Sequence, residues 1–148
     1  MVNKQSDNFN KEGIINMSHG KIVVIDDEED NCVYLKEIIS KTGYEVETFC
    51  DSSEALAKIK DSIPAMIFLD IQMPGMNGFE VLKVIRETDS LSEVPVVFLS
   101  AISSITGEEY DPETIQSKYG VRPDAFIPKM IEPAVIQEHL NRFIKDKS

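Results

Sequence analysis

The chain has 148 residues, a length typical of one domain, and its 42% hydrophobic residues are enough to bury a core. Its 26 Asp and Glu residues outnumber its 15 Lys and Arg residues, so the formal net charge is -11. This charge has the wrong sign for binding nucleic acid or anionic lipid. Two cysteines are too few for a disulfide framework, and no apolar run reaches the roughly 20 residues that span a bilayer. We therefore expect a reduced, cytoplasmic protein that binds neither nucleic acid nor membrane.

Residues 1–20 are polar and show neither a helical nor a strand period, so we expect a flexible N-terminal leader. The charges within this leader cancel, and the acidic excess therefore belongs to the rest of the chain. Residues 21–147 are predicted to form one folded domain, with no output domain attached.

From Lys21 onward, short β-branched apolar runs alternate with longer amphipathic runs. This alternation is typical of a parallel sheet covered by helices, the α/β class. The third run, residues 66–69, is continuously apolar and is therefore expected to be buried on both faces of the sheet. The predicted strands are residues 22–25, 45–49, 66–69, 95–99 and 125–127.

Amphipathic helices are predicted between these strands and after the last one. The first covers about residues 31–42 and ends at Gly43, a natural left-handed C-cap. The other helix starts are marked, in chain order, by a capping box of Asp51 with Glu54, by the loop 73–78, by Pro112 and by Pro133.

Polar or charged residues stand where four of the strands end: Asp26 and Asp27, then Asp70, Ser100 and Lys129. Ligands of an open parallel sheet bind outside the carboxyl ends of its strands, so these side chains are expected at one edge. Three carboxylates placed together repel one another and require a cation. Oxygen ligands without histidine predict Mg²⁺, and the acids are not spaced as in a calcium loop. A lysine and a hydroxyl aimed at the same point suit an incoming phosphoryl group.

Four sequence pieces occur in this order: IVVIDDEED, IFLDIQMPGMNGFEVL, VVFLSA and AFIPK. With them, the segment from Lys21 to Lys147 resembles a response-regulator receiver domain of two-component signal transduction. The resemblance implies a flavodoxin-like three-layer sandwich, with a five-stranded parallel sheet in the order 2-1-3-4-5 and five helices. It also implies a phosphorylation-dependent switch in a phosphorelay.

The resemblance assigns a role to each residue at this edge. Asp70 would accept the phosphoryl group from a phosphohistidine, forming a mixed anhydride, and would also bind Mg²⁺. For Mg²⁺, the resemblance implies direct binding by Asp27, binding mainly through water by Asp26, and a backbone carbonyl ligand from Gln72. It implies contacts to phosphoryl oxygens from Ser100 and Lys129. Phe126 would be a rotating aromatic switch. For Phe126, simple core packing remains an equal alternative.

The implied partners are a sensor histidine kinase or a histidine phosphotransfer protein. A downstream protein would bind the face formed by the fourth helix, fifth strand and fifth helix. Formation of a homodimer is a further alternative. Such a domain is not an enzyme for an external substrate, because it catalyses only its own Mg²⁺-dependent phosphorylation and dephosphorylation.

The chain departs from the family pattern at two places. Met130 stands where the family commonly has a proline joined by a cis peptide, and a non-proline cis bond costs about 2.5–4 kcal/mol. We expect Lys129 still to reach the site, through a trans or a strained cis peptide. The segment 102–123 is longer than in the family by about two helical turns, and is either a tolerated insertion or a partner surface.

Three other functions are compatible with parts of the pattern. A haloacid-dehalogenase-like phosphatase needs an acid two positions after its nucleophile, and Gln72 at that position argues against this function. A flavodoxin-like mononucleotide binder needs a phosphate-binding loop after the first strand. This chain has five consecutive acids there, which would repel a phosphate unless Mg²⁺ intervened. A degenerate receiver that acts as a phosphorylation-independent interaction module is the main alternative.

Overall fold

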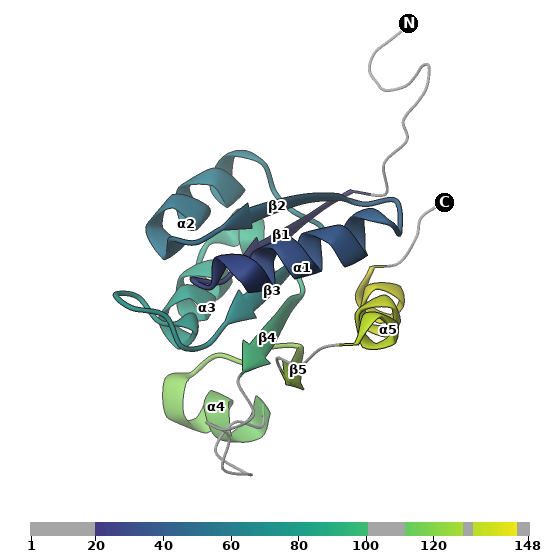
Figure 1. Ribbon diagram of the computed structural model, residues 1–148. Helices are drawn as coiled ribbons and strands as arrows, with labels where there is room; N and C mark the ends of the chain where they lie inside the picture. Colours follow the sequence, from purple (N-terminus) through teal and green to yellow (C-terminus); the bar gives the residue numbers. More distant parts are fainter. Residues whose placement is uncertain (1–19, 101–111, 129–131, 145–148) are drawn as a thin grey trace, which may run out of the picture.

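The computed structural model describes residues 20–100, 112–128 and 132–144. The strands in these ranges form one parallel sheet in the order β2-β1-β3-β4-β5 (Figure 1). Their bounds are β1 (Lys21–Ile25), β2 (Glu45–Phe49), β3 (Met66–Asp70), β4 (Val96–Ser100) and β5 (Ala125–Pro128). The predicted α/β class, the five strands and the sheet order 2-1-3-4-5 are confirmed.

The five predicted helices are also present and cover both faces of the sheet, which makes the fold a three-layer sandwich (Figure 1). Side chains of α1 and α5 pack on one face, and those of α2 and α3 pack on the other. No helix in the described ranges has the length and hydropathy that crossing a bilayer requires. The bounds are α1 (Glu29–Ser40), α2 (Ser52–Asp61), α3 (Gly78–Glu87), the short 3-10 helix η1 (Asp89–Leu91), α4 (Pro112–Tyr119) and α5 (Pro133–Phe143).

The core is divided by the sheet, because successive residues of a strand point to opposite faces. On β1, Val23 and Ile25 pack under α2 and α3, whereas Ile22 and Val24 pack under α1 and α5. Every residue of β3 is buried, since helices cover this central strand on both sides. The central position of β3 therefore explains why the residues before Asp70 form an uninterrupted apolar run.

Helix α1 is displaced from its predicted position by two residues at each end. It begins at Glu29 rather than at residue 31, because acidic side chains are favourable in the first turn of a helix. It ends at Ser40, and the backbone N–H and the hydroxyl of Thr42 both bond the carbonyl of Ile39 beyond that end. Gly43 has the expected left-handed conformation, with a φ of 97°.

Among the described residues, side-chain caps are seen at the starts of α2 and α3. Asp51 accepts a hydrogen bond from the backbone N–H of Glu54 at 2.9 Å, which is the first half of the predicted capping box. The complete, reciprocal box lies at the start of α3, where Asn77 and Glu80 each accept from the other's backbone N–H at 3.0 and 2.8 Å. Helix α3 is thereby fixed at the residue that follows the loop after β3.

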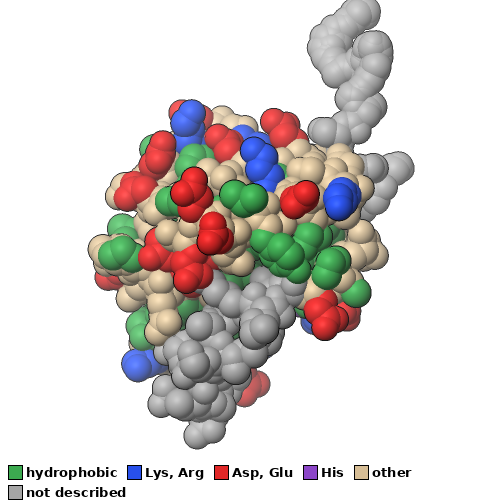
Figure 2. Space-filling model, in the orientation of Figure 1, with side chains coloured by type: hydrophobic (Ala, Val, Ile, Leu, Met, Phe, Trp, Pro, Cys, Tyr) green, Lys and Arg blue, Asp and Glu red, His purple; other side chains and the backbone are tan. Residues whose placement is uncertain are grey.

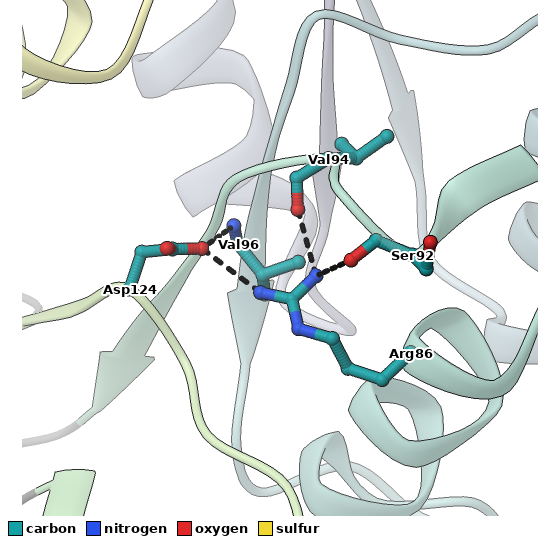
Figure 3. A network of polar contacts seen from close by, with 5 residues as sticks. All are labelled: Arg86, Ser92, Val94, Val96 and Asp124. Atoms are coloured by element: carbon teal, nitrogen blue, oxygen red, sulfur yellow. Dashed lines mark hydrogen bonds and ion pairs between the residues drawn. The ribbon is translucent and has the colours of Figure 1, made fainter.

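At the end of the sheet where the strands begin, Arg86 of α3 links the residues that precede β4 and β5 (Figure 3). Its guanidinium donates to the carbonyl of Val94 at 2.8 Å and to Oδ2 of Asp124 at 2.9 Å. The same carboxylate oxygen accepts from the backbone N–H of Val96 at 2.8 Å, and the N–H of Asp124 donates to the carbonyl of Val96. This network fixes the register of β4 against β5, on which the alignment of their carboxyl ends depends.

Candidate functional site

Two aspartates follow β1 and differ in their exposure. Asp26 is fully buried and Asp27 is exposed. The carboxylate of Asp26 accepts a hydrogen bond from the backbone N–H of Glu28 at 2.9 Å and another from the side-chain amide of Asn31. These bonds offset the cost of burying a charged group. The sequence prediction did not include Asn31, although it is the first amide side chain after the acidic run.

Asp70 is the last residue of β3, the central strand of the sheet, and only 2% of it is exposed. Its Oδ1 accepts a hydrogen bond from the backbone N–H of Gln72 at 3.3 Å. The pairing of β3 with β1 and with β4 places Asp70 between the carboxyl ends of both neighbours. From β1 the chain continues to β2 on one side of the sheet, and from β3 it continues to β4 and β5 on the other side. Asp70 therefore lies at the switch point between β1 and β3, the usual ligand position in such a sheet.

The structure brings the three aspartates together. Asp26, Asp27 and Asp70 each offer one carboxylate oxygen, and these oxygens all lie within 4.8 Å of one another. Like charges at this separation repel strongly when two of the three groups are buried. A donor set made only of carboxylate oxygens fits a small, hard divalent cation, and the exposed Asp27 leaves the set open toward solvent.

The surface around this group is strongly acidic. Asp27 and the next three residues, through Asp30, are all acidic and exposed. Figure 2 shows a cluster of Asp and Glu side chains at this position, where helix α1 begins. The local potential is negative, which favours a cation and opposes a phosphate that arrives without one.

Of Ser100 and Lys129, the other two polar or charged residues predicted at this edge, the structure describes only the backbone of Ser100. Ser100 is the last residue of β4 and pairs with Pro128 of β5, so its backbone lies at the same edge of the sheet as Asp70. Its side chain is outside the described part of the structure, and so are Lys129 and Met130 with the peptide between them. Of the long segment 102–123, residues 102–111 also lie outside, while Pro112 begins α4 as predicted.

Phe126, the predicted switch residue, lies on β5 and is half-buried. Its ring and that of Phe98 form an edge-type contact, with the centroids 5.5 Å apart and the planes at 66°. It packs against the core cluster that lies under α2 and α3. Phe126 thus lies beside Phe98 of β4, and Phe98 is two residues before Ser100 on that strand.

The loop that joins β3 to α3 is held closely against Asp70. The N–H of Gly78 donates to the carbonyl of Ile71 at 2.8 Å and closes the loop. A Cβ at Gly78 would come within 2.6 Å of the carbonyl oxygen of Asp70, closer than any real contact. Glycine is therefore required at this position by the backbone of the site itself. Gln72 is exposed within the loop.

Comparisons with known proteins agree with this geometry. A family model described as the response regulator receiver domain matches residues 22–141. The chain is 36% identical over 131 residues to hybrid signal transduction histidine kinase L of Dictyostelium discoideum, covering 86% of this chain and 7% of that protein. It is 35% identical over 132 residues to the probable transcriptional regulator ycf27 of Porphyridium aerugineum, covering 89% of this chain and 52% of that protein.

Among solved structures, the chemotaxis protein CheY4 of Vibrio cholerae superposes with a TM-score of 0.73 and 26% sequence identity. The alignment covers 85% of this chain and 99% of that one. The chain thus matches nearly the whole of that protein, whereas it spans about half or less of the length of the curated relatives named above.

Proposed function

Because this chain belongs to the family of response regulator receiver domains, and so to phosphorylation-dependent signalling, we propose that Asp70 is the residue that accepts the phosphoryl group. The observation that carries the proposal is the group of three carboxylate oxygens within 4.8 Å of one another, to which Asp70 contributes from the middle strand of the sheet. The donor would be a phosphohistidine of a sensor histidine kinase or of a histidine phosphotransfer protein.

In the proposed reaction, a carboxylate oxygen of Asp70 attacks the phosphorus of the phosphohistidine. An oxygen–phosphorus bond forms, the nitrogen–phosphorus bond breaks, and the electron pair returns to the imidazole of the partner. The N–H of Gln72, which donates to Oδ1, would help to hold the carboxylate in position for this attack. The product is a mixed anhydride, which the same site would later hydrolyse.

We expect Asp26, Asp27, Asp70 and the carbonyl of Gln72 to hold Mg²⁺. Both oxygens of Asp26 already accept protein hydrogen bonds, which suits binding through water, whereas Asp27 is exposed and available for direct binding. Bound Mg²⁺ would offset the repulsion among the carboxylates and the charge of the transferred group.

Three further residues complete the proposed switch. Lys129 would pair with one phosphoryl oxygen and Ser100 would donate its hydroxyl to another. As Ser100 moves toward the phosphoryl group, Phe126 would turn inward from its position beside Phe98. These movements would change the face formed by α4, β5 and α5, where a downstream protein or a second copy of the chain would bind.

Intact mass spectrometry after incubation with phosphoramidate and Mg²⁺ tests the proposal. We expect the wild-type protein to gain the mass of one phosphoryl group, and the Asp70→Asn variant to gain none. Asp61→Asn removes an exposed acid at the end of α2 and serves as the matched control, which should react like the wild type. A wild-type protein that gains no phosphoryl group would favour the degenerate interaction module instead, and a gain that survives Asp70→Asn would exclude Asp70 as the acceptor.

A further inference from the structure

Ser52 is a buried polar residue that the proposed reaction does not use. In the described ranges, the buried polar or charged residues are Asp26, Asp70 and Ser52, and only 6% of Ser52 is exposed. The two aspartates belong to the site. Ser52 is the first residue of α2 and comes from a different part of the chain.

The hydroxyl of Ser52 contacts the loop that follows Asp70. Its Oγ donates to the carbonyl of Met76 at 3.0 Å, and the sulfur of Met73 lies 3.8 Å from the same oxygen. Both partners lie between the end of β3 and the start of α3. Ser52 is thus a bridge from helix α2 to the middle of this loop.

Capping of its own helix does not account for Ser52. Asp51 is the N-cap of α2, and its carboxylate accepts the hydrogen bond from the N–H of Glu54 that the helix start requires. The hydroxyl of Ser52 is directed to the loop instead. Ser52, at the first helical position, therefore stabilises the loop rather than the start of the helix.

The loop is attached to Asp70 at its beginning and held closed at its end. Gln72 donates its N–H to the Asp70 carboxylate, and Gly78 closes the loop on the carbonyl of Ile71. Between these points, the bond from Ser52 to Met76 fixes the backbone from outside. Losing that bond would loosen the segment that holds Gln72 against the reacting carboxylate.

We propose that Ser52 is a positioning residue for the chemistry of Asp70, acting through the β3–α3 loop. This inference rests on the proposed function and deepens it. The loop geometry that Ser52 maintains sets how well the carboxylate is oriented for phosphoryl uptake. The effect of removing one neutral hydrogen bond corresponds to about a two- to tenfold fall in rate.

The test compares Ser52→Ala with Ser53→Ala, which removes the same hydroxyl from the next, exposed position of α2. Phosphoryl uptake from phosphoramidate with Mg²⁺ is followed by intact mass, and backbone amide exchange is measured over residues 71–78. We expect Ser52→Ala to take up the phosphoryl group about two- to tenfold more slowly and to exchange faster in the loop. Ser53→Ala should match the wild type in both measurements.

The outcomes separate this inference from the proposed function. A wild-type protein that takes up no phosphoryl group overturns both. A reactive wild type with an unchanged uptake rate in Ser52→Ala overturns only the role of Ser52, even if the variant is less stable to heat. Ser52→Cys keeps a weak donor of similar size and should give an intermediate rate. It provides the same comparison if Ser52→Ala fails to fold.

Discussion

Asp26, Asp27 and Asp70 carry the same chemical group in three different environments. Asp26 is fully buried and accepts hydrogen bonds from Glu28 and Asn31, so its carboxylate is fixed. Asp27 is exposed, and Asp70 is buried at the centre of the sheet edge. These differences predict different roles: Asp26 binds the cation through water, Asp27 binds it directly, and Asp70 reacts.

Replacement of Asp27 by Asn is expected to weaken Mg²⁺ binding by about tenfold or more while leaving the fold intact. The side chain is exposed, so the Tm without Mg²⁺ should stay the same or rise slightly as the repulsion among the carboxylates falls. The upward shift of Tm caused by added Mg²⁺, measured by thermal unfolding, should largely disappear.

Asp30→Asn is the matched control for this prediction. It removes one exposed negative charge from the first turn of α1, and Asp30 is not one of the three aspartates that meet at the site. The variant should keep the wild-type Tm shift with Mg²⁺. A full shift in Asp27→Asn, or a lost shift in Asp30→Asn, would contradict the assignment of Asp27 as a direct ligand.

At the scale of the elements, an aromatic stack joins α4 to the core. The ring of Tyr119 lies parallel to that of Phe79 of α3, with centroids 4.3 Å apart and planes within 6°. Phe79 in turn meets Phe98 of β4 edge to face at 5.4 Å, and Phe98 meets Phe126 of β5. The rings connect α4 to β5, the two elements whose shared face is proposed to change.

We expect Tyr119→Ala to loosen α4 without unfolding the domain. Aromatic pairs contribute about 0.5–1.5 kcal/mol beyond the area they bury, so amide exchange over residues 112–119 should accelerate roughly two- to tenfold. Tyr119→Phe keeps the ring and should exchange like the wild type. Equal exchange of α4 in wild type and Tyr119→Ala would show that the stack does not hold this helix.

The sequence was informative about elements but less so about their ends. Helix α4 begins at the predicted Pro112, because proline is favourable in a first turn and terminates what precedes it. Helix α1 begins two residues earlier than predicted, since the acids that end the strand also suit a helix start. Such overlapping preferences leave the boundary to tertiary packing.

At the scale of the whole molecule, the meeting of Asp26, Asp27 and Asp70 was predictable because strands of a parallel sheet end at one edge. Hydrophobic periodicity does not specify the order of the strands, which was predicted from the family resemblance. Contacts that depend on packing were missed. Ser52 follows an N-cap and carries no separate signal, and the bond between Arg86 and Asp124 joins residues 38 positions apart.

The net charge of -11 also has a more definite meaning in the folded protein. The exposed acids at the start of α1 lie beside the buried carboxylates of the site, so part of this charge is concentrated at one edge of the sheet. A partner that presents a phosphohistidine there must carry compensating positive charge, or approach after a cation has bound.

Borohydride reduction followed by peptide mass mapping tests most directly whether Asp70 carries the phosphoryl group. Borohydride reduces the mixed anhydride of an aspartyl phosphate to an alcohol, which converts the aspartate to homoserine. After treatment with phosphoramidate and Mg²⁺, we expect homoserine at position 70, and none when Mg²⁺ is withheld. Homoserine at Asp26 or Asp27, or no conversion anywhere in the chain, would contradict the central role of Asp70.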